Sequence, residues 1–511
     1  MQLYSCRERR GDEGTRPSPA GTNRATLGRA VRPSPLSGCP EPEPGPRAGN
    51  GAPAMPSPTV RCHAGVLPAI LSLALAALAI PALAQPAEPG QRAQRGPGLP
   101  NPDIMEFTNE RRWTFRARVE VRSWFERRPP DDRMPEIDHW RIETAAVIFP
   151  APNTSASHRT DISSIRGEMR FDGHRVADAP DAYLEDVAAG AGYIRFGFVA
   201  PNREPITSRE MTLQLDIPMR SYRTVYNDQV AERVPWWKED LPDDLKRVME
   251  PQPFIEFDPG IGPNRPYDTG PVDRLIAEWT DGASIDRVKS SMRPAVLAKF
   301  LAGRVAEHYT PSGNGLLFNH AGQLEAIEVF GPTVAAREAR GTPFDMATLL
   351  ASVYRRVGIP ARVVIGFDVH EQRGERERGV GLRRSGSAVP LRSWVEFALY
   401  DERDGSVTWI PVDPQRMRRV SSRMPRNFWQ RPVRFFGSHN ELDGVAPIAF
   451  HFFPPTTVRS HGQSGMPALW GWLITPTPPD RAVQALILSV SSTPITAEDQ
   501  RRERGQHRER E

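Results

Sequence analysis

The sequence predicts an α+β protein, in which an N-terminal antiparallel β-sandwich precedes an α/β domain with extra C-terminal strands. Three observations support this prediction. Apolar and polar residues alternate between residues 105 and 225, apolar residues recur at helical spacing between residues 271 and 357, and strand-like runs return after residue 420. With 511 residues, the chain is long enough for two or three domains.

The N-terminal region has the pattern of a secretory signal peptide. An uncharged apolar run covers residues 64–80, Arg61 and His63 precede it, and Ala82-Leu83-Ala84 follows it. We therefore expect a signal peptide over residues 55–84, cleaved after Ala84, and a periplasmic or secreted protein with no membrane span. The run is shorter than the about 20 apolar residues that an easy membrane anchor needs. An uncleaved anchor is the alternative.

Two segments flank this signal peptide. Residues 1–54 are rich in Arg, Pro and Gly without periodicity, which is typical of a mis-called upstream start or of a disordered segment, and Met55 stands where a signal peptide would begin. Residues 85–104 are rich in Pro and Gly and are expected to form a linker.

Composition excludes several kinds of site from the exported form. Cys6, Cys39 and Cys62 precede Ala84, so no disulfide, thiolate metal site or thiol nucleophile would remain. Residues 1–84 hold nine arginines and five acidic residues, so the formal charge of +4 falls to zero for the rest. The charge gives no argument for nucleic-acid binding. We expect no cofactor and no metal, because there is no nucleotide-binding fingerprint and no ligand spacing among His308, His320 and His451.

Residues 105–225 are expected to form the sandwich. Phe115, Ala117, Val119 and Val121 alternate with charged residues, as in a strand with one buried face. Further strands are expected at Ala145–Phe149, Gly192–Val199 and Met211–Ile217. Residues 226–270 read as a linker that contains Trp236 and Trp237. Such a pair more often anchors a linker onto a neighbouring domain than forms a carbohydrate platform.

The best-defined segment begins with a helix at residue 343. Thr342 is a plausible N-cap, Pro343 suits the first helical position, and Asp345 completes a variant capping box. Gly358 ends the helix. A buried strand is expected at Arg362–Val369, then an exposed charged loop at His370–Pro390, and then a hairpin of Trp394–Tyr400 and Val407–Asp413.

Several motifs in this segment resemble the core of the transglutaminase-like superfamily. They are Gly341, Asp345 and Ala347 around the helix start, Gly358-Ile359-Pro360-Ala361-Arg362, Trp394-Val395-Glu396, and Trp409-Ile410-Pro411-Val412-Asp413-Pro414. The resemblance covers residues 271–420 and implies a cysteine-protease-like α/β domain. Residues 421–497 would form a C-terminal β extension, and residues 498–511 a disordered tail.

The resemblance also implies where a catalytic triad would lie. The cysteine of the family falls at Pro343 and its histidine at Arg392, while Asp413 matches the third member. Proline has no nucleophile and arginine stays protonated, so acyl transfer through this triad is not available. Either Arg392 forms a closed structural pair with Asp413, or it captures an anion such as a peptide carboxylate.

These observations predict an exported, catalytically degenerate transglutaminase-like protein. It would bind polypeptide or a peptidoglycan-type peptide, with Arg392, Trp394 and Thr342 as binding residues. One alternative is an amide hydrolase or acyltransferase with a non-cysteine nucleophile. For that role Thr342 and Ser352 are the chemical candidates, although Thr342 is explained as a cap and Ser352 as a helix-surface residue. The other alternative is a structural spacer.

Overall fold

In the computed structural model, two compact units cover residues 1–91 and 92–511, and the described residues all belong to the second. The structure describes residues 103–123, 139–186, 191–238, 240–251, 256, 268–318, 324–368, 380–381, 391–420, 424–425, 427–450, 459–460, 470–476 and 482–493. The predicted segment 1–54, the signal peptide 55–84, nearly all of the linker 85–104, most of the loop 370–390 and the tail 498–511 lie outside these ranges. Within them, no helix has the length and apolar character needed to cross a membrane.

The N-terminal strands form two antiparallel sheets. The larger sheet is built around two long strands, β1 (Met105–Ser123) and β11 (Glu210–Tyr226), which pair along most of their length. Its other strands are β4 (Thr154–Ser155), β5 (His158–Thr160), β6 (Arg166–Phe171), β7 (His174–Ala177), β17 (Val380–Gly381) and β23 (Ala482–Thr493). The smaller sheet has the order β21 (Arg459–Ser460), β22 (Gly471–Thr475), β3 (Thr144–Pro150), β9 (Ala191–Val199) and β8 (Ala182–Asp186).

The two sheets face each other across an apolar core, as the predicted sandwich requires. Phe115, Ala117, Val119 and Val121 of β1 are all buried, which confirms the alternation seen in the sequence. Between the sheets, the rings of Phe171 on β6 and Phe198 on β9 lie 5.1 Å apart. This edge-to-face contact is typical of packed aromatic pairs.

The C-terminal strands complete these sheets. Strand β22 pairs with β3, and β23 pairs with β1. The sequence placed both strands in a separate extension over residues 421–497, because periodicity shows that a strand exists but not which strand it joins. The pairing is between residues far apart in the chain. Leu488 of β23, for example, lies opposite Ala117 of β1.

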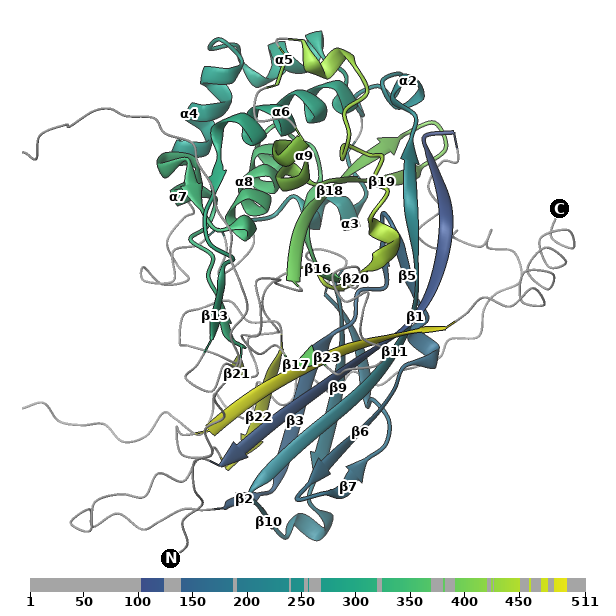
Figure 1. Cartoon of the computed structure of the whole chain (residues 1–511), viewed down its shortest axis with the longest axis vertical. Coiled ribbons are helices and arrows are strands. Elements are labelled where there is room, and N and C mark those ends of the chain that lie inside the picture. The colour runs from purple at the N-terminus through teal and green to yellow at the C-terminus, as the bar shows by residue number, and fades with distance from the viewer. Residues whose placement is uncertain are drawn as a thin grey trace, which may run out of the picture. The chain divides into compact units, whose positions relative to one another are not determined.

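A separate four-stranded antiparallel sheet lies within the α/β domain. Its order is β19 (Ser406–Val412), β18 (Leu391–Asp401), β16 (Ala361–Asp368) and β20 (Val445–Ala449). Every residue of β16 is buried, as expected for a central strand. Helix α8 (Pro343–Arg356) packs against β16 and β18. Figure 1 shows the helices gathered near this sheet and the strands of the sandwich in a separate group.

Helix α8 is enclosed by other helices on the side away from the sheet. Contacts with it are made by α4 (Gly270–Trp279), α6 (Pro294–His308), α7 (Pro332–Glu338) and α9 (Pro414–Val420). Ser352, which was expected on the helix surface, is therefore buried, and that expectation was wrong. The remaining helices and short strands are α2 (Asp228–Ala231), α3 (Asp243–Val248), α5 (Ile285–Ser291), β2 (Trp140–Ile142), β10 (Ile206–Ser208), β12 (Thr310–Pro311), β13 (Leu316–Phe318), β14 (Leu324–Ile327) and β15 (Arg340–Gly341).

Trp236 ties the segment between β11 and α4 to helix α5. Its indole N–H donates to the carbonyl of Met292 at 2.7 Å, and the ammonium of Lys289 lies 4.9 Å from its ring centroid. Trp237 packs edge-on against Trp236. The anchoring role predicted for this pair is therefore confirmed for Trp236.

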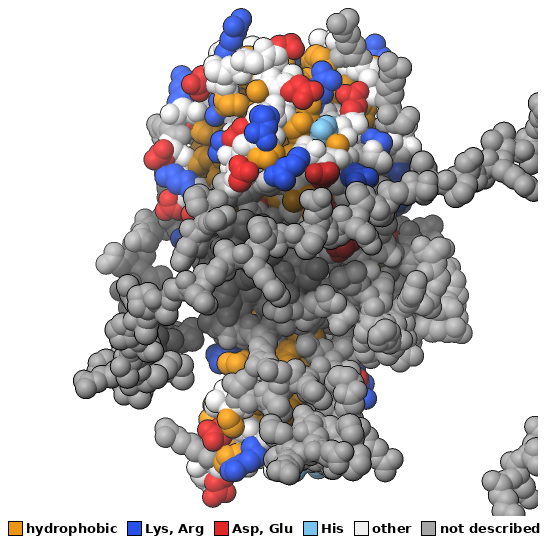
Figure 2. Space-filling model, turned by 90° about the vertical axis from the view of Figure 1, so that its left-hand side faces the viewer, with side chains coloured by type: hydrophobic (Ala, Val, Ile, Leu, Met, Phe, Trp, Pro, Cys, Tyr) orange, Lys and Arg blue, Asp and Glu red, His pale blue; other side chains and the backbone are white. Residues whose placement is uncertain are grey.

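In Figure 2, positive and negative side chains are interspersed over the helical part of the face turned to the viewer.

Candidate functional site

The first turn of α8 is fixed by a buried carboxylate. Thr342 and Asp345 form the predicted capping box, in which the Thr342 hydroxyl accepts from the Asp345 N–H and the Asp345 carboxylate accepts from the Thr342 N–H. The same carboxylate accepts from the N–H groups of Phe330 and Gly331 at 2.7 and 2.9 Å. Burial raises the pKa of Asp345 above its ordinary value, although these hydrogen bonds oppose the shift.

This carboxylate also holds the Thr342 hydroxyl. The Thr342 Oγ1 atom lies 2.8 Å from Asp345 Oδ2 and 3.0 Å from the carbonyl oxygen of Glu328. A hydroxyl has one proton to donate, and both of these neighbours are acceptors. Thr342 is buried, so its hydroxyl serves the helix cap.

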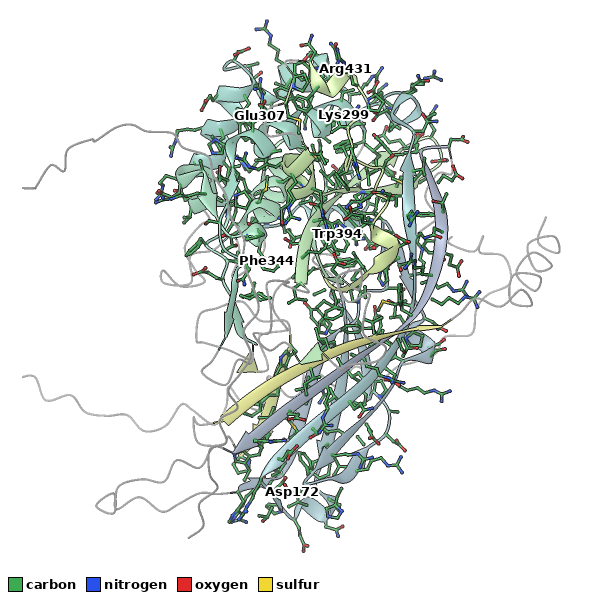
Figure 3. The ribbon with its side chains drawn as sticks, viewed as in Figure 1. Asp172, Lys299, Glu307, Phe344, Trp394 and Arg431 are labelled. Carbon is green, nitrogen blue, oxygen red and sulfur yellow. The ribbon has the colours of Figure 1, made fainter. Side chains whose placement is uncertain are left out.

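Pro343 lies next to the start of helix α9. Its carbonyl accepts a hydrogen bond from the Gln415 amide at 2.9 Å, and Gln415 follows Asp413 by two residues. Figure 3 labels Phe344 on α8 and Trp394 on β18, the two elements that carry Pro343 and Arg392. The structure thus links the Pro343 position to the segment that begins at Asp413.

Arg392 forms the centre of an ion-pair network. One of its terminal nitrogens, Nη2, lies 2.9 Å from Asp413 Oδ2, and the other, Nη1, lies 3.0 Å from Asp368 Oδ2. The carboxylate of Glu441 is 3.6 Å from Nη1 and also pairs with Arg416 at 3.0 Å. Burial acts to lower the pKa of Arg392, but Asp413 and Asp368 outweigh it and raise that pKa. Arg392 therefore remains a hydrogen-bond donor and does not accept a proton.

His439 completes the network, although no sequence motif marks this residue. Its Nδ1 atom accepts from the backbone N–H of Glu441, and its Nε2 atom lies 3.3 Å from Asp413 Oδ2 and 3.1 Å from Arg392 Nη2. The ring is fully buried, and burial lowers the pKa of His439. Both ring nitrogens are therefore already in contact with polar groups of the protein.

The Asp413 carboxylate is held in its charged form. Burial would raise its pKa, but the hydrogen bond from His439 and the positive charge of Arg392 outweigh burial and lower the pKa of Asp413 to about 2. The N–H of Arg416 also donates to Asp413 at 2.9 Å. Asp413 is therefore an acceptor with its partners already in place.

A second buried arginine joins two of the sequence motifs. Arg362 of β16 pairs with Glu396 of β18 at 2.9 Å, and its guanidinium lies 3.9 Å from the ring centroid of Trp409 and 3.8 Å from that of Phe450. Arg362 also donates to the carbonyl of Thr154, and Glu396 accepts from the N–H of Ala156. The two motifs therefore attach the β4–β5 turn to the sheet of the α/β domain.

A family model confirms the resemblance that these motifs indicated. The transglutaminase-like superfamily model matches residues 322–414, which include α8, β16, β18 and β19. This chain contains a transglutaminase-like domain. Its fold is mixed α/β, as the sequence predicted, and more of its residues lie in strands than in helices.

Three solved structures are similar to the chain. A proposed cysteine protease from Cytophaga hutchinsonii has 9% identity and a TM-score of 0.40, with 77% of this chain and 95% of that chain covered. The periplasmic domain of TgpA from Pseudomonas aeruginosa has 16% identity and a TM-score of 0.22, with coverages of 60% and 90%. A proposed protease from Parabacteroides distasonis has 11% identity and a TM-score of 0.18, with coverages of 54% and 61%. No curated protein matches the sequence. At these TM-scores, the assignment rests on the family model.

The residues predicted to bind a ligand are mostly enclosed in the transglutaminase-like domain. Trp394 has an exposed fraction of 0%, Thr342 is buried, and the Arg392 side chain is only slightly exposed. Among the other candidates, His308 contacts the carbonyl of Ala336 and the ring of Trp279. His320, His370 and His451 lie outside the described residues.

Asp368, Glu441 and His439 are the site residues that sequence reasoning missed. Asp368 could have been found from the pairing of β16 with β18, because antiparallel pairing brings the end of β16 beside the start of β18. His439 and Glu441 follow the last matching motif and carry no signal of their own. Among the described residues, no group of three or more His, Cys, Asp or Glu side chains could hold a metal ion.

Proposed function

We propose that the transglutaminase-like domain is catalytically inactive and that the chain acts as an exported polypeptide-binding protein. The observation that carries the first part is the ion pairing of Arg392 with both Asp413 and Asp368. In the family, a thiolate attacks an amide and a histidine transfers the proton. Here the cysteine position is Pro343 and the histidine position is Arg392. Neither residue can supply those functions.

The geometry also argues against capture of a carboxylate by Arg392. Three carboxylates, those of Asp413, Asp368 and Glu441, already lie within 3.6 Å of its guanidinium. An incoming anion would have to displace one of them and would meet the other two. Of the two alternatives for Arg392, we therefore propose the closed structural pair with Asp413.

An amide hydrolase that uses another nucleophile is the second candidate, and the local contacts weigh against it. The Thr342 hydroxyl is bonded within the helix cap, and both ring nitrogens of His439 are occupied. A threonine nucleophile needs a nearby base to remove its proton. The proposed inactivity is tested by incubating the full chain with peptide amides, with and without a primary amine acceptor. We expect no turnover, and turnover that disappears in Thr342→Ala would instead establish the hydrolase.

Polypeptide binding is proposed from the family's substrate class and from one exposed aromatic residue beside α8. Phe330 is 52% exposed, although a large apolar side chain is usually buried. Its backbone N–H donates to Asp345, which holds the backbone of this residue close to the first turn of α8. An exposed aromatic ring suits contact with apolar side chains of an extended polypeptide.

The binding proposal is tested with a fluorescent, unfolded model polypeptide. We expect the full chain to bind it and Phe330→Ser to weaken the binding several-fold. Val199→Ser is the matched control, because Val199 is an exposed apolar residue of the sandwich, with an exposed fraction of 70%. Equal affinity of the wild-type and Phe330→Ser proteins would contradict the proposed location. No measurable affinity in either would contradict the function.

Export is proposed from the signal-like segment at residues 55–84. The test is the N-terminal sequence of the protein recovered from the envelope fraction of cells, where we expect Gln85 as the first residue. Recovery from the cytoplasm with an intact segment would contradict export.

For the spacer alternative, deletion of the C-terminal part is a poor test, because β22 and β23 belong to the sandwich sheets.

A further inference from the structure

The outer face of the larger sheet is rich in arginine. Along β1, the odd-numbered residues from Phe115 to Val121 are buried, so the even-numbered side chains point away from the core. The same alternation applies to β11 and to β6, which pairs with β11 (Figure 1). The charged side chains on this side, which we call the arginine face, are Arg112, Arg116, Arg118, Arg122, Arg166, Arg170, Arg220, Glu120, Glu168, Glu210 and Asp216, together with Glu110, which pairs with Arg112 and Arg220.

These side chains combine a positive excess with many exposed ion pairs. Seven arginines stand against five carboxylates, and no lysine is present. Arg116 pairs with Asp216 at 3.0 Å and Arg118 with Glu120 at 2.8 Å, while the two arginine side chains remain 53% and 47% exposed. Exposed pairs contribute about 0–1 kcal/mol. A ligand carboxylate can therefore replace a protein carboxylate at little cost.

The composition of the arginine face favours one class of ligand. Guanidinium groups bind carboxylates in a bidentate manner. The carboxylates of the protein, together with Thr212 and Gln214 on the same side of β11, can accept hydrogen bonds from hydroxyl groups. Side chains repeat about every 7 Å along a strand and about every 4.8 Å across strands. Such a grid suits a polymer that carries both carboxylates and hydroxyls.

Two other anionic partners fit less well. A polyphosphate has no sugar hydroxyls to donate to the five protein carboxylates, so these carboxylates would only repel it. A membrane surface usually takes up apolar side chains as well as cations. The exposed large apolar residues among the described part of the chain are Val199, Val225, Phe330 and Val420, and none of these belongs to the arginine face.

We propose that the arginine face binds an acidic polysaccharide, with uronate carboxylates on its guanidinium groups and sugar hydroxyls on its carboxylates. This surface belongs to the sandwich sheet, so the proposal does not depend on the polypeptide binding proposed above. A single copy of the chain provides the whole surface.

The experiment uses the full chain and a fluorescently labelled polyuronate of defined length. The dissociation constant is measured by fluorescence anisotropy at low and at physiological salt, because salt screens exposed charges. The test variant carries Arg116→Gln, Arg118→Gln and Arg122→Gln. The matched control carries Arg247→Gln, Arg287→Gln and Arg293→Gln, which remove the same charge from exposed positions on or beside helices. We expect about tenfold weaker binding in the test variant and a change below about twofold in the control.

Three outcomes would overturn the proposal. They are equal binding of the polyuronate and a neutral dextran, an equal loss of affinity in both triple variants, and tighter binding of polyphosphate or of vesicles that contain phosphatidylglycerol. An unchanged unfolding midpoint establishes that the test variant is folded. If it does not fold, Arg166→Gln replaces it, because among the described residues Arg166 has no ion pair. We then expect about threefold weaker binding, with Arg287→Gln as the single-site control that leaves the affinity unchanged, and equal affinities of these two variants would overturn the proposal.

Discussion

Two arginines of the transglutaminase-like domain, the buried Arg362 and the largely buried Arg392, lie on neighbouring strands and differ in how their charge is balanced. Arg362 has one carboxylate partner, Glu396, and lies between two aromatic rings. Arg392 has Asp413, Asp368 and Glu441 around it. Burial lowers the pKa of Arg362, whereas the carboxylates around Arg392 raise the pKa of that residue.

Each arginine also has a buried histidine nearby. His158 lies on β5 near Arg362 and Arg159, and burial followed by these positive charges lowers its pKa to about 3. His439 lies beside Arg392 and Asp413. The comparison indicates that the Arg362 cluster is positive, enclosed and structural, whereas the Arg392 cluster is rich in carboxylates and slightly open to solvent.

Loss of Arg362 should produce the largest effect. Arg362→Ala leaves Glu396 fully buried without its partner, and breaking a buried pair in this way costs about 3–5 kcal/mol. We expect that loss in the free energy of unfolding, measured in urea. Arg356→Ala, which removes an exposed pair with Asp273, is the control and should cost less than about 1 kcal/mol. Similar values for the two variants would remove the structural role assigned to Arg362.

Loss of Arg392 should cost less. In Arg392→Gln, water can reach the partly exposed site, and Asp413 keeps its hydrogen bonds from His439 and Arg416. We expect a loss of about 2 kcal/mol in the free energy of unfolding. Arg392→Lys keeps the charge but cannot bond two carboxylates with the same planar fork, so it should recover only part of the loss. An effect as large as that of Arg362→Ala would contradict the distinction between the clusters.

The histidine near Arg362 should make the protein sensitive to acid. The pKa of His158 is about 3 in the folded protein and about 6.5 in an unfolded chain. Below pH 6.5 the unfolded chain binds a proton that the folded protein does not, so the free energy of unfolding falls as pH falls toward 3. The slope approaches about 1.4 kcal/mol per pH unit.

His158→Gln tests this dependence because glutamine does not titrate. The variant should have a flatter profile of unfolding free energy against pH between 6.5 and 4, whatever its stability at neutral pH. His308→Gln, at a partly exposed histidine of α6, is the control. Parallel profiles for the wild-type and His158→Gln proteins would assign the acid sensitivity to other groups.

The smallest effect on stability is expected at Pro343. This residue occupies the first position of α8, where a missing N–H costs little, so Pro343→Cys should change the free energy of unfolding by less than about 1 kcal/mol. We expect no amide turnover from the new thiol, because Arg392 stays protonated and burial lowers the pKa of His439, which makes it a poor base. The double variant Pro343→Cys with Arg392→His supplies both groups and is the informative comparison. Turnover by the single variant would reveal a base elsewhere.

Local sequence patterns predicted the elements of the transglutaminase-like domain well. The cap at Thr342, the end of the helix near Gly358 and the buried strand beginning near Arg362 depend on neighbouring residues, so the sequence contains the necessary information. The contacts that define the site do not depend on neighbouring residues, so local patterns could not predict them. His439 reaches Asp413 through a loop that no motif marks, and the fully enclosed position of Trp394 results from the packing of several elements.

The return of the chain to its first sheets has a consequence for biosynthesis. Ser491 of β23 contacts Thr114 of β1 across 377 positions of sequence, so β1 lacks one neighbour until the end of the chain has been made. The transglutaminase-like domain has all its sheet strands by Ala449 and can fold before that time. A ribosome that stops early would therefore release a folded domain attached to an open sheet edge, which is a template for aggregation. Quality control of this protein should depend on its last forty residues or so.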